Sequence, residues 1–113
     1  MTSKDDRLYL DHIAESIGKI AEYTAGGRAT FIHSGVLQDA TLRRLQTFAE
    51  STQRLSTEIK ERHPEIPWRE IAAFRHRIVH DYLSSFDLEL AWTFIEKDLP
   101  QLKSAIGEEL ERR

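Results

Sequence analysis

The chain contains no cysteine, and this absence excludes disulfide bonds and any thiolate metal site. Proline and glycine are also scarce, at 3 and 5 of 113 residues, whereas fibrous and low-complexity sequences contain far more of both. Charged residues make up 31% and hydrophobic residues 40% of the sequence, which is typical of a folded helical protein. We therefore expect residues 1–113 to form one helical domain with a real core.

Long hydrophobic runs are missing as well. No apolar stretch approaches the ~20 residues that a transmembrane helix needs. The first residues, Met1–Asp6, are polar where a secretory signal would be apolar. From these two observations we expect a cytoplasmic protein that makes no contact with a membrane.

The sequence also has no excess of positive charge, since its formal net charge is −3. This balance argues against a general nucleic-acid coat protein, which is usually basic. The charge is uneven, however: the segment from Arg43 to Arg77 carries eight Lys and Arg against five Asp and Glu, a local +3. Such a segment is compatible with phosphate binding, and equally with opposite charges paired along solvated helix faces.

Hydrophobic periodicity predicts an all-α fold, a four- to five-helix up-and-down bundle with mostly antiparallel neighbours. A first helix is expected from about Asp5 to Tyr23. A second is expected from about Ser34, its N-cap, to Glu61. The prolines of His63–Pro67 should then break the chain, because proline disfavours helix in the residue before it.

The third predicted helix begins at Pro67, which suits the first helical position, and ends between His80 and Leu83. Its expected buried stripe consists of Trp68, Ile71, Phe74, Ile78 and Val79. A fourth helix should follow Asp87 as its N-cap. Pro100 either kinks this helix or starts a separate fifth one.

The third helix carries the motif Arg75-His76-Arg77-Ile78-Val79-His80-Asp81-Tyr82. Arginine presents a planar fork that fits a phosphate, and histidine takes or gives a proton near neutral pH. Metal-free cleavage of RNA requires these two roles. The spacing from Arg to His alone discriminates weakly, because it also occurs in Arg7/His12 and Arg28/His33.

Residue types alone favour an ordinary explanation of this motif: a histidine stabilised by the helix dipole and an arginine whose stem lies along the surface. Five residues on an ideal helix place Arg75 and His80 about 140° apart, a gap that the length of arginine can close. Tyr82 is nearly two turns from Arg75 and would project from the same side if the helix reaches it, whereas a helix that ends after His80 leaves its direction open; it could equally be a half-buried helix-end aromatic. The other histidines, His12, His33 and His63, lack a convincing set of metal ligands.

Two segments, Glu61–Ile71 and Arg75–Tyr82, resemble the HepT-type toxins of the HEPN superfamily, which are small all-helical ribonucleases. The family motif is Arg, a polar residue, three further residues, His, and a Tyr two places on. Its second place is most often Asn and is His76 here. Further matches extend from Leu8 to Ile106 and include Gln38-Asp39-Ala40, Arg43, Glu50 and Asp98–Leu102; Thr47-Phe48-Ala49-Glu50 replaces the usual Ile-Ile-Gly-Glu.

This resemblance implies a homodimer in which the motif helices of two protomers face one another across a cleft. In such a site His80 would transfer the proton of an attacking ribose 2′-OH, and Arg75 would stabilise the charge on the phosphoryl oxygens. His76, Arg43 and Glu50 are the supporting residues of this expectation. Neither a metal nor a cofactor is expected, and the implied substrate is RNA, with tRNA as one candidate.

The resemblance also implies a partner, a cognate minimal nucleotidyltransferase that acts as the antitoxin of a type VII-like toxin–antitoxin pair. In that family the partner attaches AMP to the motif tyrosine, which is Tyr82 in this sequence. A different class of function remains open: a non-catalytic helical binding subunit of a nucleotidyltransferase complex, in which the motif serves packing or nucleotide contact.

Overall fold

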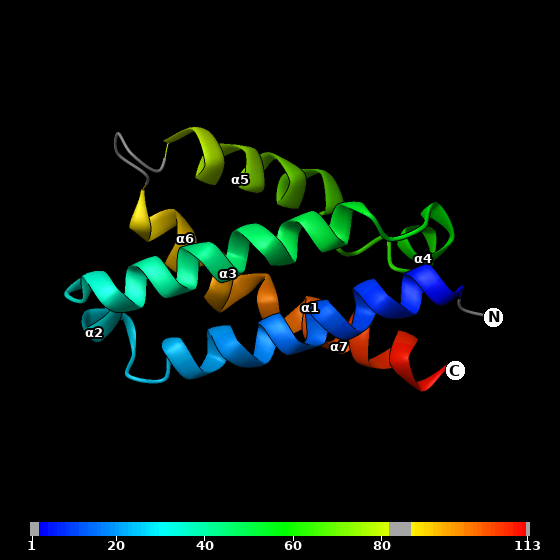
Figure 1. Cartoon of the computed structure of the whole chain (residues 1–113), viewed down its shortest axis with the longest axis horizontal. Coiled ribbons are helices and arrows are strands. Elements are labelled where there is room, and N and C mark those ends of the chain that lie inside the picture. The colour runs from blue at the N-terminus through cyan, green and yellow to red at the C-terminus, as the bar shows by residue number, and fades with distance from the viewer. Residues whose placement is uncertain (1–2, 82–86, 113) are drawn as a thin grey trace.

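Figure 1 shows the computed structural model, which describes residues 3–81 and 87–112. Seven helices occur in these residues: α1 Lys4–Tyr23, α2 Arg28–Ile32, α3 Gly35–Gln53, α4 Thr57–Arg62, α5 Trp68–Asp81, α6 Leu88–Lys97 and α7 Leu99–Glu111. The described chain contains no strand, which confirms the all-α prediction. No helix in these two ranges has the length and apolar character needed to cross a membrane.

Helices α1, α3 and α5 lie side by side, each antiparallel to the next, and α7 covers α1 from another side (Figure 1). Apolar residues that recur at three- and four-residue intervals build the core between them. In α1 these are Leu10, Ile13, Ile17 and Ile20, all buried. This spacing keeps one face of each helix turned inward.

Three phenylalanines join α5 to the rest of the core. The ring of Phe94 in α6 lies 5.0 Å from Phe74 of α5 and 5.9 Å from Phe48 of α3, measured between ring centroids. Such aromatic contacts stabilise the fold beyond the area that they bury. They fix the buried face of the helix that carries Arg75 and His80.

The expected second helix is wrong in one respect, because it is broken into α3 and α4. The backbone turns at residues 54–56, where the N–H groups of Arg54 and Leu55 bond to carbonyls only three residues back. Ser56 then caps α4 by accepting a bond from the Ile59 N–H at 3.3 Å. The Ser56 N–H itself donates to the buried carboxylate of Asp6 in α1, at 2.9 Å, so a tertiary contact stabilises the break.

The short helix α2 was not predicted. Gly27 precedes it with φ of 91°, a conformation that favours glycine. Phe31 is fully buried and its ring lies 5.6 Å from Trp92 of α6. The side-chain amide of Gln38 donates to the last carbonyls of α2, at 2.9 and 3.0 Å. The buried Phe31 ring and the Gln38 hydrogen bonds hold α2 in place. Its five residues are too few to show a helical period, so the sequence pattern did not predict this helix.

The remaining boundaries follow the sequence closely. Ser34 and Asp87 cap α3 and α6 as expected, each with its side-chain oxygen accepting from the first turn. Pro100 lies in the first turn of a separate helix, α7, and does not kink α6. Pro67 precedes α5, whose first helical residue is Trp68, one place later than predicted.

Candidate functional site

The predicted site residues Arg75 and Glu50 meet where α5 packs against α3. The Arg75 Nη2 group donates to Glu50 Oε1 at 3.2 Å, and 34% of the arginine side chain is exposed. Its Nε atom is buried, with no hydrogen-bond partner among the described residues. Since a guanidinium has five N–H donors, Glu50 orients Arg75 and leaves donors available for a phosphate.

His76 and His80 lie together on the exposed side of α5. Their ring centroids are 4.1 Å apart with 44° between the planes, as expected for residues one helical turn apart. The side chains of Arg75 and His80, both within the described chain, make no direct hydrogen bond. One helix therefore presents the guanidinium at its seam with α3 and the imidazoles on its outer surface.

Val79 was predicted to be buried, and this prediction is wrong. Its side chain is 42% exposed, whereas Ile71, Phe74 and Ile78 are buried. The stripe closes with Ile78, because the next residue on a helix turns by ~100° away from the core. Val79 therefore adds an apolar surface beside the two histidines.

The remaining predicted residues lie elsewhere. Arg43 lies on α3 beside Arg44, at a cavity between α3 and α1. Tyr82 lies outside the described residues, one place beyond the last residue of α5. In residues 3–81 and 87–112 no group of three or more His, Asp or Glu is placed to hold a metal ion. The metal-free site stays a prediction.

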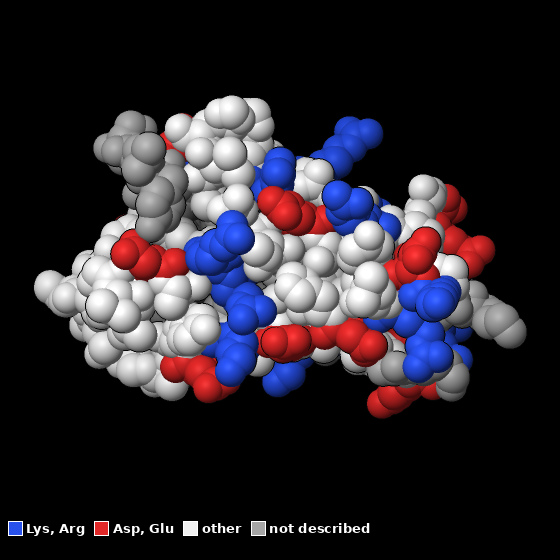
Figure 2. Space-filling model, viewed as in Figure 1, with Lys and Arg blue, Asp and Glu red and all other residues white. Residues whose placement is uncertain are grey.

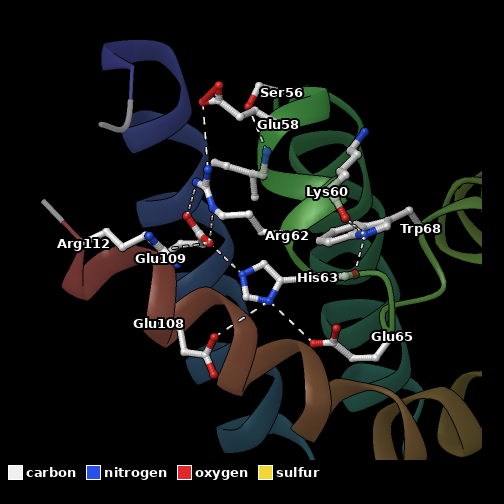
Figure 3. Close-up of polar contacts among 11 residues, drawn as sticks. Ser56, Glu58, Lys60, Arg62, His63, Glu65, Trp68, Glu108, Glu109 and Arg112 are labelled. Atoms are coloured by element: carbon white, nitrogen blue, oxygen red, sulfur yellow. Dashed lines mark hydrogen bonds and ion pairs between the residues drawn. The ribbon is translucent and has the colours of Figure 1, made fainter.

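A buried charge cluster fixes the start of α5 and was missed in the sequence (Figure 3). Glu109 of α7 has a fully buried side chain and accepts two bonds from Arg62, at 2.6 and 3.1 Å. His63 Nε2 lies 2.6 Å from Glu109 Oε2. These hydrogen bonds, that from Arg62 first, lower the pKa of Glu109 from 4.5 to about 2, although burial opposes them. In turn Glu109 raises the pKa of Arg62.

A backbone carbonyl links this cluster to α5. The carbonyl of His63 accepts a bond from the indole N–H of Trp68, the first residue of α5, at 3.0 Å. A sign of this cluster was present in the sequence, because Leu102, Ile106 and Glu109 are spaced by four and three residues. A glutamate in an apolar register is buried only with charged or hydrogen-bonding partners.

Comparisons with known proteins identify the family of this chain. The pattern that defines the ribonuclease HepT-like family matches residues 13–108. A protein of Methanocaldococcus jannaschii, named as a gamma-glutamylcyclotransferase and proposed RNase, is 40% identical over 104 residues. That match covers 91% of this chain and 46% of the relative, so this chain spans about half of that protein's length.

Two further relatives match over most of their own length. A protein of Caldanaerobacter subterraneus subsp. tengcongensis, named as a proposed RNase, is 31% identical over 110 residues, which cover 96% of this chain and 97% of the relative. A probable ribonuclease HepT of Thermococcus cleftensis is 35% identical over 96 residues, or 84% and 86% of the two chains. No solved structure gives a significant match. The chain belongs to the ribonuclease HepT-like family.

Proposed function

We propose that this protein is a metal-independent endoribonuclease. The names of its relatives support RNA as the substrate. The observation that carries the proposal is the Arg75 guanidinium, oriented by Glu50 and with 34% of its side chain exposed, on the helix that also exposes His80. The same helix thus offers a phosphate-binding cation and a group that transfers protons at neutral pH.

The chemistry follows from these two groups. The ribose 2′-oxygen attacks the adjacent phosphorus, and the bond from phosphorus to the 5′-oxygen breaks, which leaves a 2′,3′-cyclic phosphate and a free 5′-OH. His80 accepts the 2′-OH proton and becomes an imidazolium, which then gives a proton to the leaving 5′-oxygen. Arg75 stabilises the negative charge that builds on the phosphoryl oxygens.

A homodimer is part of the proposal. Because Arg75 points to the seam with α3 and His80 to the outer surface, a second copy against α5 would supply complementary groups from its own motif. The exposed Val79 beside His76 gives that surface an apolar centre, which supports association of this face. The composite site would then contain two Arg75/His80 sets.

We further propose that the protein is the toxin of a type VII-like pair, silenced by a minimal nucleotidyltransferase that attaches AMP to Tyr82. The position of this residue, one place after α5 and two after His80, supports the assignment. An adenylate adds a negatively charged phosphate, the group that the proposed substrate-binding arginine recognises, so it would compete with RNA for that arginine.

The decisive experiment compares the parent protein with His80→Ala and Arg75→Ala on an RNA substrate in the presence of a chelator. Each variant should lose at least about 100-fold in cleavage rate, the usual contribution of one acid–base or charge-stabilising group. His33→Ala is the matched control, because Arg28 and His33 repeat the spacing around α2, outside the site. Equal cleavage by all four proteins, or cleavage that requires added metal, contradicts the mechanism.

A further inference from the structure

A second basic site lies on the surface between α1 and α3. It is a cavity of about 350 Å³ lined by His12, Tyr23, Ala40, Arg43, Arg44 and Thr47. Figure 2 shows a band of Lys and Arg side chains that crosses from α3 to α1 on this face. Two arginines, a histidine and a tyrosine in one small cavity form an environment suited to an anion attached to an aromatic group.

The positive charge of this cavity is only weakly neutralised. Arg43 is exposed and has no ion-pair partner among residues 3–81 and 87–112. Arg44 Nη1 lies 4.0 Å from an oxygen of Glu15, and 62% of that glutamate side chain is exposed. The Arg44 side chain is 25% exposed, and a pair at this distance with a solvated glutamate contributes little, so neither guanidinium group is firmly held by an acid.

The other two polar residues define the walls. The imidazole of His12 is held by a 2.7 Å hydrogen bond between its Nδ1 atom and the Ser51 hydroxyl. Tyr23 is the last residue of α1 and contributes an aromatic ring to the lining. Cations that track a backbone, next to aromatic faces on which bases stack, are the usual components of a single-strand nucleic-acid groove.

The geometry of α3 connects this cavity to the proposed catalytic site. Arg43 and Glu50 are seven residues apart, so they share one face of the helix and lie about 10.5 Å apart along its axis. Glu50 is the residue that holds Arg75. A distance of about 10.5 Å equals the rise of about three nucleotides in a stacked strand, and of fewer in an extended one.

We infer that the cavity between α1 and α3 is a phosphate-binding subsite for RNA, placed one to three nucleotides from the phosphate at Arg75. This inference rests on the proposed ribonuclease function and extends it. Arg43 and Arg44 bind the backbone phosphate, and Tyr23 stacks on a base beside it. RNA that is long enough to fill both positions binds more tightly than a dinucleotide, which fills one.

The test measures binding apart from cleavage. Fluorescence anisotropy follows a labelled ten-nucleotide RNA binding to the His80→Ala protein, alone and with Arg43→Gln and Arg44→Gln added. The two glutamines should weaken binding by about tenfold. They should also reduce the slope of log affinity against log salt by about 0.7 for each phosphate that an arginine no longer neutralises. The preference for the ten-nucleotide RNA over a dinucleotide should disappear.

Arg54→Gln is the matched control, since Arg54 is the exposed residue directly after the same helix and lies outside the cavity. It should leave affinity and salt slope unchanged. The single variant Arg43→Gln changes only an exposed side chain, so it can replace the double variant in this test if the double substitution affects folding. If the Arg43/Arg44 and Arg54 variants bind RNA with equal affinity while the parent protein cleaves RNA normally, the subsite is overturned and the proposed function stands. If the parent protein neither binds nor cleaves RNA, both the subsite and the proposed function are overturned.

Discussion

Replacement of Glu109 by glutamine should destabilise the protein strongly, although this residue lies in the last helix and belongs to none of the site residues predicted from the sequence. The substitution keeps the shape of the side chain and removes its charge. Arg62, His63 and Arg112 surround the carboxylate, at closest distances of 2.6, 2.6 and 3.5 Å. The glutamine would leave the half-buried Arg62 without its buried anion, a costly arrangement in a protein interior, since its other acidic neighbour, Glu58, is 72% exposed and 3.9 Å away.

The magnitude follows from the lowered pKa of Glu109. A decrease from 4.5 to about 2 corresponds to about 3 kcal/mol of stabilisation by the charged form at neutral pH. This is a large part of the 5–15 kcal/mol that typically separates folded and unfolded states of a domain. For a chain of this length it lowers the melting temperature by about 10 °C. Urea unfolding followed by circular dichroism at pH 7 measures the difference directly.

Acidification provides an independent check. Because the pKa of Glu109 is lower in the folded state, its stabilisation is complete above pH 4.5 and is lost as the pH falls towards 2. The free-energy difference between parent and Glu109→Gln should therefore shrink from about 3 kcal/mol at pH 7 to below about 1 kcal/mol near pH 2. The parent should show the steeper loss of stability over this range.

Glu108→Gln is the matched control, since Glu108 precedes Glu109, lies 3.9 Å from His63 and is 69% exposed. A surface charge of this kind should change stability by less than about 0.5 kcal/mol. Equal effects of the two substitutions at pH 7, or a difference that stays constant on acidification, would refute the conclusion that the buried charge cluster stabilises the fold.

The remaining predictions concern the proposed site. Sedimentation at micromolar concentration should show a dimer, and Val79→Asp should shift it to the 13.1 kDa monomer; a parent that is already monomeric contradicts the composite site. Tyr82→Phe should cleave RNA yet gain no AMP by intact-mass spectrometry with the nucleotidyltransferase and ATP; equal additions on both proteins exclude this acceptor. Zinc ions should inhibit cleavage reversibly, because His76 and His80 have the one-turn spacing of a chelating pair, with ring centroids 4.1 Å apart. His76→Asn should lower zinc affinity in calorimetry, and unchanged affinity excludes this pair.

Local signals in the sequence predicted most of the helices. Ser34 and Asp87 cap their helices as expected, and apolar spacing gave α1 and α7 within a few residues. The break between α3 and α4 could not be predicted, because its stabilising contact comes from Asp6, 50 residues away in the chain. Capping and periodicity act within a few turns, whereas a tertiary hydrogen bond joins segments that the sequence does not relate.

The candidate site was predictable to a similar degree. The motif and the resemblance selected Arg75, Glu50, His76 and His80, and the structure places these residues in two separate contacts, Arg75 with Glu50 and His76 with His80. The sequence did not indicate which side of α5 each would occupy, and Val79 was assigned to the wrong one. Helical spacing gives the angle between two side chains around the helix axis. The packing of neighbouring helices decides which side of the helix faces the core.

The contacts of α5 explain how this helix can be held firmly by the core and still expose one side to solvent. Its first residue, Trp68, is held by His63 and thus by the Glu109 cluster, and its buried face is held by Phe74 against Phe94. These attachments lie on the core side of the helix. The opposite side, with His76, Val79 and His80, is therefore presented to solvent on a fixed support. Because a pre-organised group loses little further freedom on binding, this surface is suited to meet a second copy or an RNA strand without reordering.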